Sequence, residues 1–246
     1  MSFEDDIKSS LSLDDLTIIR ASCSRSNISY RAKAYISKIE KERIVEIFNY
    51  ISNFQSKEFL TKEDKIIVFC PSEENVNLVA DFFNYSRFYS SLSKEEKTKT
   101  LNEFLTSKDT YYSILVSTSA LQEGFDYSFI RLVVYKDIAY SFIGFLQGSS
   151  RGGRDNRPST SIFFYNSRDS RLTSSTSSIS SSPSSTSTLI EDQRLVYSYL
   201  RETTCRRRQI NLYLNSELID ECSNLDIKCD LCFTRASTYS KQVSRI

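Results

Sequence analysis

Short apolar runs alternate with amphipathic helical patterns between residues 38 and 165, and this alternation constrains the fold more than any other feature. The run Lys65–Phe69 (KIIVF) is continuously apolar after its lysine, which is typical of a parallel strand buried on both faces. Further strands are expected at Ser113–Val116, in the apolar run that follows Asp126, and at Ser161–Tyr165. Strands and helices in this order predict an α/β domain with a mostly parallel sheet.

Helical periodicity and capping signals predict the helices between these strands. Residues 38–54 form an amphipathic pattern, and Ser72 is the expected N-cap of a second helix. The sequence from Ser93 to Glu96 is a capping box that opens a third helix, which continues to about Leu105. The apolar faces of the first two helices comprise Ile44, Ile47, Phe48 and Ile51, and Val76, Val79, Ala80 and Phe83. Upstream, the segments 16–20 and 25–30 are expected as two edge strands.

A glycine-rich loop carries Arg151 and Arg154 with Gly152 and Gly153 between them, in a chain that has only 5 glycines. Arginines held in this way are suited to binding phosphate groups. Because ligand sites in parallel sheets form at the carboxyl ends of strands, we expect this loop to gather there with residues 70–72 and 117–126. The alternative to phosphate binding is that Arg151 and Arg154 are surface arginines in a turn. The Gly124-x-Asp126 sequence likewise fits an ordinary turn.

The composition excludes several kinds of site. The chain contains no histidine, so histidine bases, Cys/His dyads and mixed Cys/His metal sites are ruled out. The net charge of +1 gives no overall basic field, so any nucleic-acid surface must be local. No G-x-x-x-x-G-K-[ST] phosphate loop is present, and no acidic pair follows a buried strand to hold Mg²⁺. No apolar run approaches the length of a membrane span, and no membrane partner is expected.

Residues 173–188 (TSSTSSISSSPSSTST) have almost no apolar content and are expected to be a linker. A helix is predicted after it at Glu191–Thr203, with Leu195, Tyr199 and Leu200 available for packing, and a helix-like stretch then reaches about Leu218.

Four of the six cysteines crowd into the C-terminal part of the chain, as Cys205, Cys222, Cys229 and Cys232. This C-x16-C-x6-C-x2-C spacing can close one tetrahedral site, for which zinc is the expected ion. The adjacent Arg206-Arg207-Arg208 sequence is expected to lower the thiolate pKa values and to offset the charge of the site. Four unrelated structural cysteines are the alternative.

Several segments, in order, resemble the second half of RecQ-like superfamily 2 DNA helicases, and most of all the fungal subtelomeric RecQ-like helicases. The similar segments are Arg25–Tyr30 (R-P-N-x-x-Y in the family), Lys65–Ser72 (motif IV), Phe88–Leu92 (Y-H-A-G-L), Val116–Arg131 (motif V), Gln147–Asp155 (motif VI, Q-x-x-G-R-x-G-R-D) and the four cysteines with Cys205-Arg206-Arg207 (the zinc-binding subdomain).

The resemblance implies a RecA-like helicase C-terminal lobe followed by a small helical zinc-binding subdomain. Its implied divisions are an inter-lobe linker (1–35), the lobe (36–172), the Ser/Thr-rich linker (173–188), the zinc subdomain (189–235) and a tail (236–246). It further implies a nuclear, telomeric or subtelomeric location.

The resemblance also implies roles for individual residues. Arg151 and Arg154 would reach the γ-phosphate of ATP, and Gln147 would orient their loop. Gly124 and Asp126 would lie near the nucleotide. Ser117 and Thr118 would contact the DNA backbone.

This sequence departs from the family pattern at several positions. Ser26 replaces proline, Tyr89 replaces histidine, and Ser150 replaces the motif VI glycine beside Arg151. The segments that bind ATP and Mg²⁺ in the family belong to a first lobe that has no counterpart in these residues, so we expect no ATPase activity from the chain alone. Two functions remain open: the second lobe of an ATP-dependent DNA helicase that works with a first lobe upstream or in trans, or an inactive, zinc-stabilised module for DNA binding or protein interaction.

Overall fold

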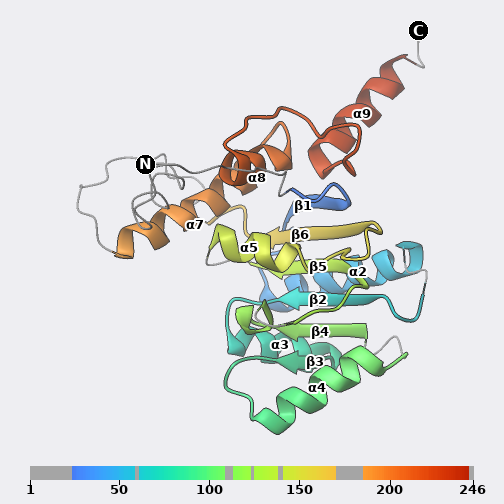
Figure 1. Ribbon diagram of the computed structural model, residues 1–246, viewed down its shortest axis with the longest axis vertical. Helices are drawn as coiled ribbons and strands as arrows, with labels where there is room; N and C mark the ends of the chain where they lie inside the picture. Colours follow the sequence, from blue (N-terminus) through green and yellow to red (C-terminus); the bar gives the residue numbers. More distant parts are fainter. Residues whose placement is uncertain are drawn as a thin grey trace, which may run out of the picture.

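The computed structural model describes residues 24–58, 61–108, 113–122, 125–137, 141–169 and 185–243. Six strands form one sheet in the order β1-β6-β5-β2-β4-β3, and every pair of neighbours is parallel (Figure 1). The strands are β1 (Ile28–Ala34), β2 (Lys65–Phe69), β3 (Ser86–Phe88), β4 (Ile114–Ser117), β5 (Ile130–Lys136) and β6 (Ser159–Tyr165). The predicted parallel α/β fold is confirmed.

Helices cover both faces of the sheet. The helices are α2 (Glu40–Glu58), α3 (Glu73–Phe83), α4 (Lys94–Thr106), α5 (Phe142–Ser149), α7 (Ser185–Arg201), α8 (Arg206–Asn215) and α9 (Asp230–Val243), with a short 3₁₀ turn, η2 (Ser119–Gln122). Ile66 and Val68 of β2 face a core shared with α2 and α3, whereas Ile67 and Phe69 face the core shared with α4, α5, α7 and α8. All five residues of β2 are buried, as its continuous apolar run predicts.

The local capping predictions are confirmed. The Ser72 hydroxyl accepts a hydrogen bond from Asn75 N, and Ser93 and Glu96 form the reciprocal capping box of α4. In α2, the predicted face is buried through Ile44, Ile47 and Ile51, while Phe48 stacks on Phe83 of α3 with 4.3 Å between ring centroids.

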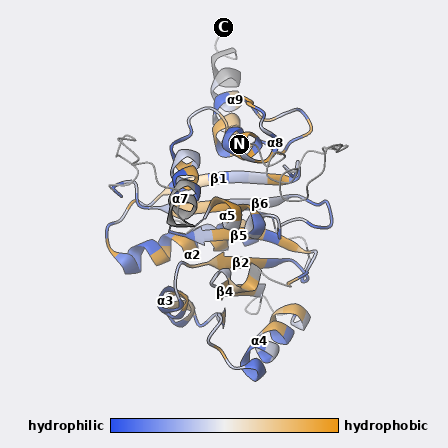
Figure 2. Cartoon of the chain, turned by 60° about the vertical axis from the view of Figure 1, so that its left-hand side comes forward, coloured by the Kyte–Doolittle hydropathy of each residue, from blue (hydrophilic) through white to orange (hydrophobic). Residues whose placement is uncertain are grey.

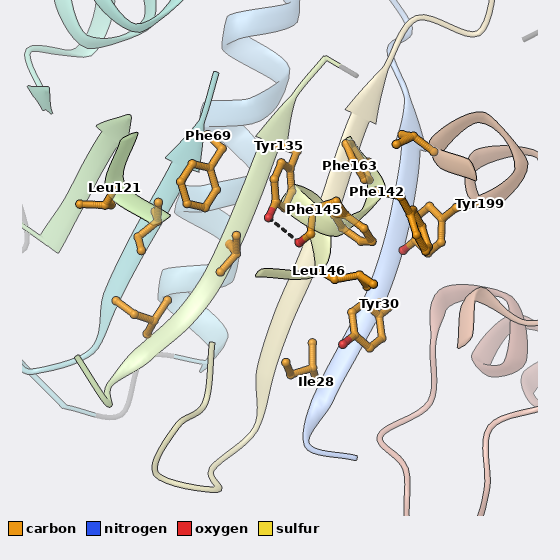
Figure 3. Packing of buried hydrophobic residues seen from close by; sticks show 14 of the residues in the cluster. Ile28, Tyr30, Phe69, Leu121, Tyr135, Phe142, Phe145, Leu146, Phe163 and Tyr199 are labelled. Atoms are coloured by element: carbon orange, nitrogen blue, oxygen red, sulfur yellow. Dashed lines mark hydrogen bonds between the residues drawn. The ribbon is translucent and has the colours of Figure 1, made fainter. Parts of the chain in front are cut away.

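Aromatic residues fill the second core, between β5, β6, α5 and α7 (Figure 3). The Tyr135 hydroxyl donates to the Phe145 carbonyl at 2.9 Å, and the Phe145 ring lies 4.9 Å from that of Tyr199. Tyr199 and Leu200 are buried and Leu195 packs against the same cluster, so α7 is part of the main core. Apolar residues accordingly concentrate along the central strands, whereas α2 and α4 present polar outer faces (Figure 2).

Several expected boundaries differ from the structure. The three-residue strand β3 was not predicted, because Ser86–Phe88 is too short to show an alternating pattern. Helix α7 begins at Ser185, inside the expected linker, and α8 ends at Asn215 rather than near Leu218. Helix α9 continues to Val243, through most of the expected tail. The expected strand at 16–20 lies outside the described residues, as does most of the linker. None of the described helices combines the length and apolar character that a membrane crossing requires.

Candidate functional site

The predicted ligand groups lie at two opposite edges of the sheet, not together at the carboxyl edge. The arginine loop follows α5 and precedes β6, so it lies where the strands begin, and Gly153 N donates to the carbonyl of Ile130, the first residue of β5. Residues 70 and 117 lie where β2 and β4 end, and Cys70 N donates to the Ser117 carbonyl at 2.8 Å. The expectation of one shared site was wrong because a loop that leads from a helix into a parallel strand lies at the amino edge.

At the amino edge, both arginines are anchored to residues 125 and 126. Arg151 Nη1 donates to the Phe125 carbonyl, and Arg154 Nη1 pairs with the Asp126 carboxylate. The Nε atom of Arg151 is buried and donates to no atom of the described residues. Burial lowers the pKa of Arg151, and the nearby charge of Arg154 lowers it further. Asp126 is largely exposed, so its ion pair with Arg154 is weak, and a more strongly charged anion can replace the Asp126 carboxylate.

A buried ion-pair network fixes the base of this loop. Arg131, at the start of β5, donates from Nε to Asp64 at 2.8 Å and from both terminal nitrogens to Asp155. Burial alone would raise the pKa of Asp155, but the hydrogen bonds from Arg131 and from Arg157 N outweigh it and hold the pKa below its ordinary value. No role for Arg131 or Asp155 is predicted from the sequence, although Arg131 closes the motif V segment and Asp155 closes the motif VI segment.

The two glycines allow the loop to lie directly on its neighbours, with Gly152 against the first residue of β6 and Gly153 against the segment that precedes β1. A Cβ atom on Gly152 would lie 2.3 Å from Ser159 Oγ, and one on Gly153 would lie 2.5 Å from Asn27 Nδ2. Gly153 also has a φ of +60°, which disfavours other residues. Arg25 donates to the carbonyls of Ser150 and Gly153 from the same segment.

Other predicted loop residues contribute less or fall outside the structure. The Gln147 side chain is exposed on α5, and the backbone carbonyl of Gln147 accepts a hydrogen bond from the Ser150 hydroxyl at 2.8 Å. Ser150 has φ −68° and ψ −8°, an ordinary helical conformation, so its replacement of a glycine introduces no backbone strain. Gly124 lies outside the described residues.

The carboxyl edge presents a small polar surface. Ser117 is fully buried and its hydroxyl donates to the Thr118 carbonyl at 2.8 Å, whereas Thr118 is half-buried and Ser119 is exposed. A contact of the Ser117 side chain with DNA would require the end of β4 to open.

The four cysteine thiols converge, as the spacing predicts. All four residues are buried, and their sulfur atoms lie within 4.8 Å of one another. Cys205 Sγ lies 3.7 Å from Cys222 Sγ and 4.0 Å from Cys229 Sγ. Zinc bonded to four sulfurs at about 2.3 Å in a tetrahedron separates them by about 3.8 Å, so the group fits this ion.

Backbone N–H groups point at the same sulfur atoms. Cys229 N donates to Cys222 Sγ, Cys232 N to Cys229 Sγ, and Cys222 N to Cys232 Sγ, at 3.4 to 3.5 Å. The side-chain hydrogen bonds with Cys205 and Cys222 lower the pKa of Cys229, whereas the shared hydrogen bonds and burial raise the pKa values of Cys205 and Cys222, contrary to the expectation that all the thiolate pKa values are lowered. The backbone N–H donors stabilise the thiolate form that a metal ion requires.

The arginines after Cys205 have a different role from the one predicted. Arg207 is fully buried and donates to the carbonyls of Arg25, Ser26 and Ile28, while Arg206 pairs with Asp230 at 3.0 Å. The prediction that these two guanidinium groups offset the charge of the cysteine site is therefore replaced by a structural role. Both connect the cysteine cluster to its surroundings.

Comparisons with known proteins agree with this architecture. Residues 50–156 match the helicase conserved C-terminal domain family. The ATP-dependent DNA helicase hus2/rqh1 of Schizosaccharomyces pombe is 26% identical over 247 residues, which cover 96% of this chain and 17% of the relative. The ATP-dependent DNA helicase Q5 of Rattus norvegicus is 26% identical over 239 residues, covering 89% of this chain and 23% of the relative.

A third relative, from Acanthamoeba polyphaga mimivirus, is named as the ATP-dependent RNA helicase R290 and is 26% identical over 86% of this chain and 37% of its own length. The chain thus spans between 17% and 37% of these three relatives. Among solved structures, domain 2 of the DEAD-box helicase Mss116p, bound to an RNA duplex, has a TM-score of 0.48 and 12% identity over 76% of this chain and 79% of that one.

The chain is therefore similar to the conserved C-terminal domain of helicases over residues 50–156, and relatives named as ATP-dependent DNA helicases match most of its length.

Proposed function

We propose that the chain supplies the second lobe of an ATP-dependent RecQ-like DNA helicase. ATP and Mg²⁺ would be held by a first RecA-like lobe, either in the same longer protein or in trans. In this function, Arg151 and Arg154 would stabilise the negative charge that develops on the transferred phosphoryl group. Gln147, Gly124 and Asp126 would border the nucleotide, and DNA-backbone contacts would come from the Ser117–Thr118 end of β4.

The observation that carries this proposal is the incomplete pairing of the two arginines on a rigidly held loop. Among the residues that the structure describes, Arg151 keeps a buried Nε donor without a partner, and Arg154 is paired only with the exposed Asp126 carboxylate. Buried donors without partners are rare and frequently mark functional positions. An anion that approaches the loop can satisfy Arg151 and replace Asp126 without rebuilding the fold.

Zinc in the four-cysteine group is part of the same proposal. Bound there, zinc would supply a structural cross-link between three distant segments of a region that has little core of its own. The region 189–235 would then be the zinc-binding subdomain, while residues 1–35 would connect to the first lobe.

The test uses a longer protein, or a reconstituted complex, in which a first lobe is present. Arg154→Ala should lower the kcat of DNA-stimulated ATP hydrolysis by roughly a thousandfold, the lower range for removal of an arginine finger. Arg87→Ala, which removes an exposed arginine–aspartate pair on β3, is the matched control and should retain kcat. Unchanged turnover in Arg154→Ala would contradict the role of Arg154. DNA-stimulated ATP hydrolysis by the isolated chain, abolished by Arg154→Ala, would contradict the expectation that the chain alone has no ATPase activity.

The nucleic acid is proposed to be DNA, because relatives named as DNA helicases match most of the chain. One relative is named as an RNA helicase, so stimulation of ATP hydrolysis should be compared for single-stranded DNA and RNA of the same sequence. Greater stimulation by RNA would overturn the choice of DNA.

We also propose a nuclear location, at subtelomeric chromatin, on the motif resemblance to fungal subtelomeric RecQ-like helicases. Chromatin immunoprecipitation of the tagged protein tests this directly: enrichment of subtelomeric over internal sequences supports it, and equal recovery contradicts it.

The alternative of an inactive, zinc-stabilised module loses one of its supports. A serine in place of the motif VI glycine would favour that alternative if it strained the backbone beside Arg151, but Ser150 adopts an unstrained helical conformation.

A further inference from the structure

Residues 24–28 are hydrogen-bonded on one side to the arginine loop and on the other to Arg207 and Ile227, which lie next to cysteines of the four-cysteine group. This short stretch is here named the bridging segment. Its first four residues precede edge strand β1, and Ile28 is the first residue of that strand. It has no metal ligand and no group assigned to phosphate binding. Its contacts nevertheless join two sites that lie far apart in the sequence.

On one side, the bridging segment holds the arginine loop. Asn27 Nδ2 donates to the carbonyls of Gly153 at 2.7 Å and Arg157 at 2.9 Å, and Asn27 O accepts from Ser159 N at 3.0 Å. Arg25 donates to the carbonyls of Ser150 and Gly153. The acceptors are the carbonyls of the residues immediately before Arg151 and Arg154. These bonds therefore fix the backbone positions from which both arginine side chains extend.

On the other side, residues next to the cysteine ligands hold the bridging segment. Arg207, two residues after Cys205, donates to Ser24 Oγ at 2.6 Å and to the carbonyls of Arg25, Ser26 and Ile28. Ile227 N, two residues before Cys229, donates to the Ser26 carbonyl at 2.8 Å. Both donors therefore lie within two residues of a cysteine of the group.

We propose that the bridging segment couples metal binding at the four cysteines to the position of the arginine loop, and that Arg25 and Asn27 are positioning residues for Arg151 and Arg154. With metal bound, Arg207 and Ile227 hold the bridging segment against the loop. When metal is removed, Arg207 and Ile227 lose their fixed positions, and the loop loses the support of Asn27 and Arg25. The consequence for catalysis rests on the proposed function, but the structural coupling does not.

Hydrogen exchange of the full chain measures this coupling without requiring activity. Amide exchange is followed by mass spectrometry for the zinc-loaded protein and for the chelated protein. Chelation should accelerate exchange in residues 150–157 by about tenfold, the effect of losing roughly one net hydrogen bond. Strands β3 and β4, at the far edge of the sheet (Figure 1), are the internal control and should change less than about twofold.

Variants separate the bridge from the metal site. Asn27→Ala should keep one zinc per chain and exchange faster in residues 150–157 even with zinc bound, and chelation should then add little. Arg25→Ala should behave similarly, and Arg87→Ala is the matched control that should behave as wild type. Joined to a first lobe, Asn27→Ala should lower kcat while the KM for ATP changes less than about twofold, because the variant misplaces groups that act in the transition state.

Two results would overturn the coupling. One is unchanged exchange in residues 150–157 of the wild-type chain when chelation accelerates exchange around the cysteines, a comparison that needs no variant. The other is an Asn27→Ala protein that keeps the full wild-type response to chelation. If instead the coupling holds but Arg154→Ala retains full ATP hydrolysis, the proposed function fails and the bridge remains.

Discussion

The Asp155→Asn substitution should destabilise the chain by about 3 kcal/mol, through the buried Arg131 network. Asp155 accepts two hydrogen bonds from Arg131, whose side chain is 4% exposed, while Asp64 on the other side is fully buried. The amide can accept from only one of the two nitrogens and carries no charge to balance Arg131. Breaking one partner of a buried pair costs about 3–5 kcal/mol, and the 16% exposure of Asp155 places it at the lower end.

Urea unfolding of the zinc-loaded chain at pH 7 measures this change. The midpoint should fall while the m value stays constant, because the substitution changes the stability and not the surface exposed on unfolding. The melting temperature should fall by roughly 6–12 °C for a chain of this size. The matched control is Asp81→Asn, which removes an Asp–Arg pair whose aspartate is 63% exposed, and it should lose less than about 1 kcal/mol.

The pH dependence provides a second, independent check. The pKa of Asp155 is lower in the folded chain than its ordinary value, so its contribution is fully present above the unfolded pKa of about 3.9. The contribution is lost as the pH falls through the lower, folded pKa. The difference between wild type and Asp155→Asn should therefore be constant from about pH 5 to 7 and shrink below about pH 4. A difference under 0.5 kcal/mol at pH 7, within the range of surface substitutions, would refute this account of the loop base.

Three further results are expected. Metal analysis of the purified chain should find one zinc per chain, and Cys229→Ser should remove it, whereas a folded wild-type chain without metal would contradict the site. Asp230→Ala should cost about 2–4 kcal/mol in urea unfolding, because it leaves Arg206 and the Ala32 N–H group of edge strand β1 without their shared carboxylate; a loss under 1 kcal/mol would mean that water replaces it. Ser93→Ala should cost about 1 kcal/mol through loss of the α4 capping box, measured in the same way, and no loss would show that α4 is held by packing alone.

Local patterns predicted the layout of the lobe because the deciding interactions there are short-range. Ser72 and Ser93 cap helices whose first turns lie within three residues, and the continuous apolar run of β2 requires burial on both faces. The convergence of four cysteines could also be predicted, because few arrangements of clustered thiols other than a metal site are stable. Residues a few positions apart carried the helix and strand signals, and the cysteines lie within one short region of the chain.

The position of the arginine loop was mispredicted although the sequence contains the signal for it. The loop follows a helix and precedes a strand, and in a parallel sheet every such loop lies at the amino edge. The partners of Arg131, by contrast, are separated from it by 67 and 24 positions, and no local pattern links them. The predicted role of Arg206 and Arg207 differs from the structure for the same reason. A run of arginines is usually exposed, and Arg207 is buried because it donates to carbonyls of residues 25–28, which lie far away in the sequence.

The separation of the two edges has a consequence for how the proposed helicase lobe would work. Strand β5 has seven residues, all buried, and spans the sheet from the arginine loop to the carboxyl edge, a length of about 20 Å. A close-packed strand of this kind does not transmit motion by bending, because each displacement would open cavities on both faces. Nucleotide contact at Arg154 and nucleic-acid contact at Thr118 would therefore be coupled by movement of the lobe as one rigid body. Substitutions that uncouple ATP hydrolysis from unwinding without loss of stability should then occur in the segments that join this lobe to its neighbours, and not inside β5.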